Sequence, residues 1–63
     1  MFRVQLEKAD GFTLLGKNEY RLPETAEGEA EGFYNYIAGT GIGGYRAVRV
    51  LDEDGTVYSE MEC

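Results

Sequence analysis

The chain has 63 residues, 43% of them apolar, with twelve acidic side chains against six basic ones, no histidine and a net charge of −6. This length allows one domain over residues 1–63, and the apolar content favours a packed core over a disordered chain. A single cysteine without histidine excludes an internal disulfide and a zinc cage, and the acidity argues against direct binding to nucleic acid or to an anionic membrane.

The first fifteen residues have the pattern of a β-hairpin. Apolar and polar residues alternate over residues 2–7, and Asp10-Gly11 then offers the positive φ angles of a tight turn. Gly16-Lys17-Asn18 would bulge or end the return strand, and residues 19–22 could extend it. A turn of three residues predicts that one face of the sheet carries Phe2, Val4, Leu6, Phe12 and Leu14, with Leu6 opposite Leu14.

The middle segment indicates a helix that starts at Pro23, because proline suits the first helical turn. Gly39 is expected to end it in the left-handed conformation. The competing interpretation makes residues 33–38 a strand and the fold a small all-β barrel. Helical spacing fits better, since it gathers one apolar stripe of Ala26, Ala30, Phe33, Tyr34 and Ile37.

The last sixteen residues repeat the hairpin pattern around Asp54-Gly55, 44 residues after Asp10-Gly11. A two-residue turn pairs Val48 with Met61 and Arg49 with Glu60, whereas a three-residue turn shifts the pairing by one. We therefore predict an α+β fold of order β-β-α-β-β, in which two hairpins form a four-stranded antiparallel sheet and one helix packs on one face.

Two short motifs resemble ligand-binding loops but are better explained as turns. Residues 39–44 match G-x-G-x-x-G, but nucleotide-binding loops of this kind follow a strand and precede a helix, and here the order is reversed. Residues 52–55 are acidic, yet aligning Gly55 with the glycine of a calcium loop leaves apolar residues at the first and last ligand positions. We expect no cofactor and no metal.

Catalysis and nucleic-acid binding both lack the residues that they need. Without histidine there is no ordinary base for Ser59 or Cys63, and so short a chain leaves little concavity, so we expect no enzyme. Cys63 is expected to be a free thiol on a frayed end, with an intermolecular disulfide as the alternative. The basic residues are scattered, and Arg46 and Arg49 are expected on opposite faces of one strand.

The acidic helix face either keeps the protein soluble or forms a contact surface. Gly28 and Gly32 would let a partner approach closely, and an exposed tyrosine beside carboxylates suits docking against arginine. The leading hypothesis is a small non-enzymatic module that binds a basic protein surface, in its strongest form a nucleic-acid mimic like the small inhibitors of phages and mobile elements. The predicted partner-binding residues are Glu24, Glu27, Glu31, Tyr36, Asp52, Glu53 and Asp54.

The alternative is a structural or accessory module that self-associates, as a homodimer, through Leu15, Leu51 and Tyr58 on the open face of the sheet. A third hypothesis is a small-ligand binder that uses the glycine-rich loop. The expected compartment is the cytoplasm of the producing or host cell, because no apolar run suits a signal peptide or a membrane span.

Overall fold

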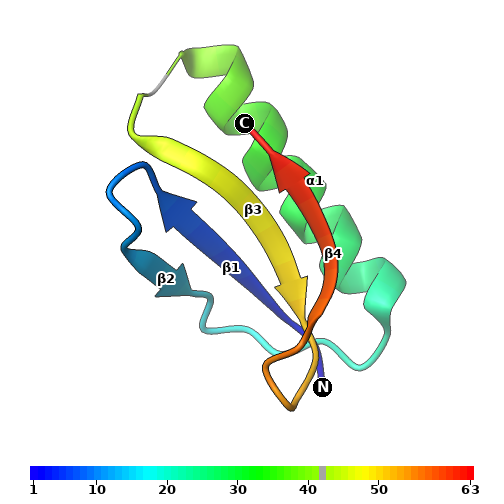
Figure 1. The fold of residues 1–63 in the computed structure, drawn as a ribbon. Helices are drawn as coiled ribbons and strands as arrows, with labels where there is room; N and C mark the ends of the chain where they lie inside the picture. The colour runs from blue at the N-terminus through cyan, green and yellow to red at the C-terminus, as the bar shows by residue number, and fades with distance from the viewer. Residues whose placement is uncertain (42) are drawn as a thin grey trace.

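The computed structural model describes residues 1–41 and 43–63. The elements in chain order are β1 (Arg3–Lys8), β2 (Thr13–Leu15), α1 (Pro23–Thr40), β3 (Tyr45–Leu51) and β4 (Val57–Glu62). The strands form one antiparallel sheet of order β2-β1-β3-β4, and α1 lies across one of its faces (Figure 1). This confirms the predicted α+β fold, and because the sheet is open the barrel alternative is wrong.

Both hairpins turn through the same three-residue loop. In the first, the amide of Lys8 donates to the carbonyl of Phe12 at 2.8 Å, and Gly11 has a φ of 92°. In the second, the amide of Asp52 donates to the carbonyl of Thr56 at 2.9 Å, and Gly55 has a φ of 83°. Glycine is favoured at that position because residues that carry a side chain rarely adopt a positive φ.

The predicted pairings are correct in both hairpins, although the second turn differs from the prediction. Leu6 lies opposite Leu14, and Val48 lies opposite Met61. A three-residue turn alone would shift the second register by one residue. The ladder instead contains an irregularity between Val50 and Leu51, and this bulge restores the pairing that the apolar pattern demands.

The helix begins at Pro23 as predicted and ends later than predicted. Gly39 is inside the helix, and the left-handed residue is Gly41, with a φ of 68°. The hydroxyl of Thr40, the last helical residue, donates to the carbonyl of Tyr36 at 2.7 Å. Residues 33–38 are therefore helical, which excludes the strand interpretation.

The core lies between α1 and the two central strands. Ala26 and Ala30 are completely buried, and their small side chains let the helix backbone approach the sheet closely. Tyr20 packs against this core and forms a β-bridge with Phe2. The buried cluster consists of Val4, Ala26, Ala30, Ile37, Val48 and Val50.

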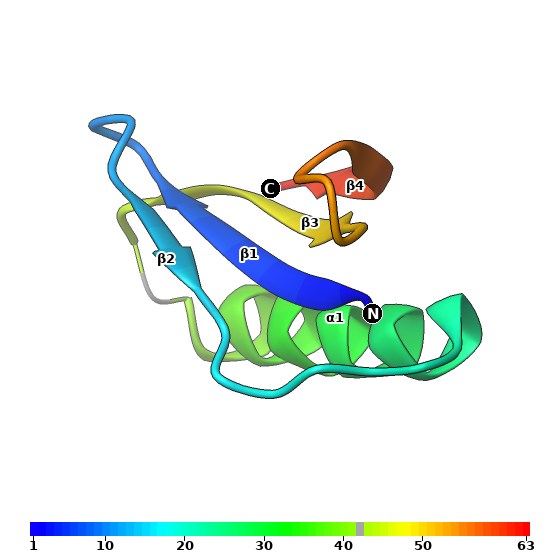
Figure 2. The ribbon, with the colours of Figure 1, turned by 90° about the horizontal axis from the view of Figure 1, so that it is seen from below.

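Strand β2 contributes little to this core, although Leu14 lies opposite Leu6 as predicted. Phe12 and Leu14 are 59% and 39% exposed. Among the described residues α1 contacts β1, β3 and β4 but not β2. Figure 2 shows the reason: the sheet twists, and its β2 edge diverges from the helix axis. One helix covers only the nearer strands.

The glycine-rich segment connects a helix to a strand. Gly41 ends α1, Gly44 has a φ of 92°, and β3 starts at Tyr45, so the order is opposite to that of a nucleotide-binding loop. Ile42 of this motif lies outside the described residues. Cys63 is a free, exposed cysteine, but the end is not frayed, because its amide donates to the carbonyl of Arg46 at 2.8 Å. The described part of the chain contains no helix with the length and apolarity that a bilayer span requires.

Candidate functional site

The open face of the sheet carries a network of ion pairs centred on Arg49. Its guanidinium binds Glu7 of β1 at 2.5 Å and also binds Glu60 of β4, directly opposite in the register. A further hydrogen bond joins Arg49 to Gln5, at 3.3 Å. The Arg49 side chain is only 18% exposed. The hydrogen bonds that Arg49 donates to Glu60 and, to a smaller extent, to Glu7 raise the pKa of Arg49 above its ordinary value.

Glu7 also binds Arg46, so the expectation that Arg46 and Arg49 serve opposite faces is wrong. One Glu7 oxygen is 3.0 Å from Arg46 and the other contacts Arg49. The register between β1 and β3 shifts between Glu7 and Lys8, and a bulge of this kind changes the direction of the neighbouring side chains. Arg46 is held further by a 2.9 Å hydrogen bond to the carbonyl of Ala9.

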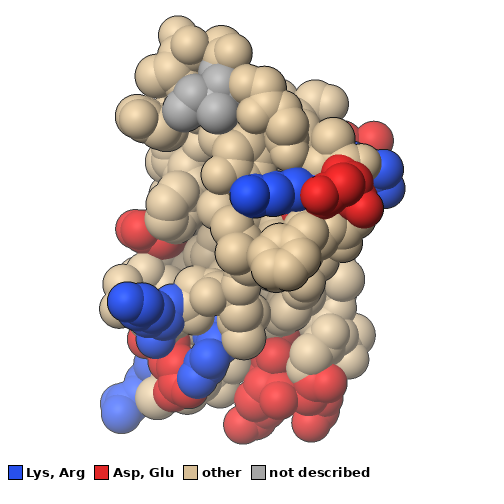
Figure 3. Space-filling model, turned by 90° about the vertical axis from the view of Figure 1, so that its left-hand side faces the viewer, with Lys and Arg blue, Asp and Glu red and all other residues tan. Residues whose placement is uncertain are grey.

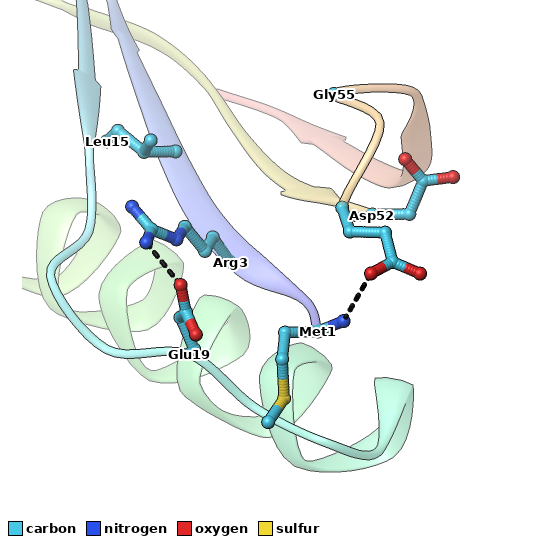
Figure 4. A pocket seen from close by; sticks show the side chains of 7 residues that line it. Met1, Arg3, Leu15, Glu19, Asp52 and Gly55 are labelled. Atoms are coloured by element: carbon cyan, nitrogen blue, oxygen red, sulfur yellow. Dashed lines mark hydrogen bonds and ion pairs between the residues drawn. The ribbon is translucent and has the colours of Figure 1, made fainter.

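A separate ion pair lies at the start of β1, beside a hollow of about 280 Å³ (Figure 4). Arg3 binds Glu19, and the hydrogen bond between them lowers the pKa of Glu19 below its ordinary value of 4.5. The terminal amine of Met1 lies 3.7 Å from the carboxylate of Glu53 across the same hollow. Asp52 and Gly55 also line this hollow.

Two of the predicted partner-binding residues in the β3–β4 turn are already engaged. One oxygen of Asp52 accepts the amides of Asp54 and Thr56, each at 2.9 Å, so this carboxylate stabilises the turn. Glu53 pairs with the terminal amine. Of the three acidic residues of this turn, only Asp54 has neither an ion pair nor a side-chain hydrogen bond in the described part of the chain.

The predicted helix carboxylates have a different environment. Glu24, Glu27 and Glu31 are exposed, and none takes part in an ion pair within residues 1–41 and 43–63. They follow one another at spacings of three and four, which places them on one flank of α1. Like charges at these spacings repel by a few tenths of a kcal/mol. The sequence therefore concentrates negative charge here at a small cost in helix stability.

Tyr36 was grouped with these glutamates but lies on the other flank. It is 61% exposed and lines a shallow hollow of about 360 Å³ together with Glu29, Gly32 and Phe33. Phe33, assigned to the core by its spacing, is 39% exposed. The signal was present in the sequence, because spacings of three, one and three place these four residues on one side of a helix.

Charge is distributed unevenly along the molecule. Residues 32–45 contain no Lys, Arg, Asp or Glu. The uppermost part of Figure 3, where α1 ends, is accordingly free of charged side chains on the face shown, whereas both signs occur lower on that face. In the described chain no group of three Cys, Asp or Glu side chains is placed to hold a metal ion.

Comparison with known proteins finds no matching family model, no similar curated protein and no similar solved structure.

Proposed function

We propose that this protein is a small non-enzymatic binding module that docks the carboxylates of α1 on a basic surface of another protein. The observation that carries this function is a difference in pairing. Arg3, Arg46 and Arg49 are occupied by Glu19, Glu7 and Glu60, whereas no ion pair in the described chain involves the exposed glutamates of the helix. A basic partner would supply the missing positive charge.

Rigidity makes these charges useful for recognition. The helix packs on the sheet through the buried Ala26 and Ala30, so the backbone positions that carry its glutamates are set before a partner arrives. Preorganised charges of one sign accelerate association with a complementary surface and select against acidic partners.

The spacing of the charges favours the nucleic-acid-mimicking form of the proposal. Four glutamates, three on one flank and Glu29 on the other, occur between Glu24 and Glu31, a stretch of about 10 Å at the helical rise, so successive charges projected on the helix axis are about 3.5 Å apart. Phosphates along one strand of duplex DNA are about 3.4 Å apart along its axis. A basic groove that binds nucleic acid would meet a similar linear charge density on α1.

The experiment measures binding of a fluorescently labelled nona-arginine peptide between about 50 and 300 mM NaCl. We expect the affinity to fall steeply with salt. The double variant Glu27→Gln/Glu31→Gln should weaken binding about tenfold, because each lost contact with an ionised group contributes roughly 0.5–1 kcal/mol at an exposed surface.

The matched control is Glu53→Gln/Glu62→Gln, which also removes two negative charges, but from positions outside the helix. It should weaken binding only about twofold through the change in net charge. Equal losses in the two double variants, or an affinity that ignores salt, would contradict docking through α1.

A second candidate function, self-association, is favoured by the uncovered β2 edge. Leu14 and Leu15 of β2 and the preceding Phe12 are exposed, and α1 does not contact this strand. Of the residues first expected to mediate it, Leu15 and Tyr58 are exposed but Leu51 is half-buried, beside the polar network of the open face. Sedimentation equilibrium decides this case: a monomer at millimolar concentration contradicts it.

A further inference from the structure

The hollow on the second flank of α1 has a chemical composition that the acidic surface alone does not explain. Its lining consists of Gly32, the aromatic residues Phe33 and Tyr36, and Glu29, which contributes the single carboxylate. A Cβ built at Gly32 would meet no atom within 4 Å, so this position is open to solvent. The hollow measures about 360 Å³, which is ample for one long side chain.

We propose that this hollow receives an arginine side chain of the basic partner. This inference rests on the proposed function and names the site at which the partner is recognised. A guanidinium stacks on aromatic rings through cation–π attraction, and its planar fork donates two parallel hydrogen bonds to a carboxylate. The aliphatic stem of the arginine would lie over Gly32.

Charge decides between an arginine and the other occupants of an apolar hollow. Glu29 lies at its rim, and no ion pair in the described chain neutralises this carboxylate. A second copy of the chain would bring its own helix glutamates against those of the first, and such like-charge contacts are unfavourable. A purely apolar segment would bury Glu29 without a partner.

One internal cation lies close to this flank. Lys17 lines an adjoining hollow with Glu29 and Phe33, but it makes no ion pair within 4.0 Å in the described residues. Its ammonium therefore competes weakly with an incoming guanidinium. The Lys17→Gln variant is expected to strengthen arginine binding about twofold by removing this competitor.

The test compares nona-arginine with nona-lysine, two peptides of equal charge, by calorimetry at about 150 mM NaCl. Charge attraction alone would bind both equally. The proposed site predicts that the protein binds nona-arginine about fivefold more tightly, the factor that corresponds to one exposed cation–π contact. Tyr36→Leu, which keeps an apolar side chain and removes the ring, should lower this preference to about twofold.

The decisive variant is Gly32→Leu, which fills the hollow. Leucine favours helices over glycine, so the variant is expected to fold at least as well as the parent chain. It should abolish the preference for arginine. The matched control, Gly39→Leu, adds the same side chain to the same helix where there is also open space, and it should keep the preference.

The outcomes separate the two proposals. Salt-dependent binding with no preference for arginine, or a preference that survives in Gly32→Leu, overturns the arginine site and leaves the docking function in place. A lack of binding of both peptides at about 50 mM NaCl overturns the docking function and the site together.

Discussion

The open face of the sheet and the outer surface of α1 both present glutamates, and they differ in what neutralises them. On the sheet, Glu7 and Glu60 bind arginines of β3. On the helix, Glu27 and Glu31 are exposed without an ion pair in the described residues. Carboxylates of the first kind stabilise the fold, whereas those of the second kind repel one another and have no ion pair within the described chain to offset the repulsion.

Sequence counts alone do not reveal this difference. Net charge treats every carboxylate as equal, but in the folded chain the arginines that form ion pairs, Arg3, Arg46 and Arg49, all lie on strands of the sheet. Cross-strand neighbours are fixed by the register, so Arg49 meets Glu60 whenever the apolar residues of β3 and β4 face the core. The helix has no basic residue between Pro23 and Thr40 to play the same role.

The largest effect on stability is expected in the buried core between the sheet and α1, because this core supports both surfaces. Val48 is completely buried between them, and Val48→Ala should lower the free energy of unfolding by about 2–3 kcal/mol through lost contacts and a cavity. Denaturant titration by circular dichroism checks this, with helix and sheet signals lost together. Val57→Ala, at an exposed position, should change stability by less than about 0.5 kcal/mol. Separate transitions for helix and sheet would show that the two surfaces are not one folded unit.

The next effect tests the paired surface. Arg49→Met should destabilise the protein by about 2 kcal/mol, since it leaves the half-buried Glu7 with Arg46 alone and Glu60 without a partner. Arg21→Met is the matched control, because Arg21 is exposed and forms no ion pair in the described chain; it should change stability by less than about 0.5 kcal/mol. If the two substitutions changed the free energy of unfolding equally, the ion pairs of Arg49 would not stabilise the fold.

The unpaired surface should respond in the opposite direction. Glu27→Gln/Glu31→Gln relieves a like-charge pair at a spacing of four and should raise the free energy of unfolding by roughly 0.3–0.5 kcal/mol. Thermal denaturation at low and high salt checks this, and the gain should shrink as salt screens the repulsion. A clear loss of stability would mean that these carboxylates serve the fold after all.

The smallest effect concerns Glu19, whose pKa is lowered in the folded protein by its hydrogen bond to Arg3. A lowered folded pKa contributes stability above the ordinary value of 4.5, and this contribution is lost as the pH falls through the folded pKa. Glu19→Gln should therefore be slightly less stable than the parent at neutral pH and equal to it in acid. Carboxyl titration by NMR should give Glu19 a midpoint below 4.5 that returns to the ordinary value in Arg3→Leu.

Local patterns predicted most of the fold. The alternation of apolar and polar residues predicted the strands, and Pro23 predicted the start of the helix. The two Asp-Gly steps predicted the turns. The exposure of Phe12 and Leu14 was not predictable in this way, because it depends on sheet twist and on how far one helix reaches. The end of the helix was missed because two glycines two residues apart, Gly39 and Gly41, are equally good stop signals until packing selects one.

The candidate site was predicted in part. The exposed position of Glu24, Glu27 and Glu31 follows from helical spacing. The hydrogen bonds that Asp52 accepts from backbone amides depend on turn geometry. The hollow that Glu29 lines with Phe33 and Tyr36 was missed because the helical pattern was used only to find the core-facing stripe and the acidic face. Both are local arrangements that composition and net charge do not encode.

The most direct measurement is a backbone amide NMR map of the protein titrated with nona-arginine at about 150 mM NaCl. If α1 is the contact surface, the shifted resonances will belong to residues 24–36, and those of Gln5, Glu7, Arg49 and Glu60 will stay in place. Shifts centred on the sheet, or spread evenly over all acidic residues, would contradict the assignment of binding to the helix.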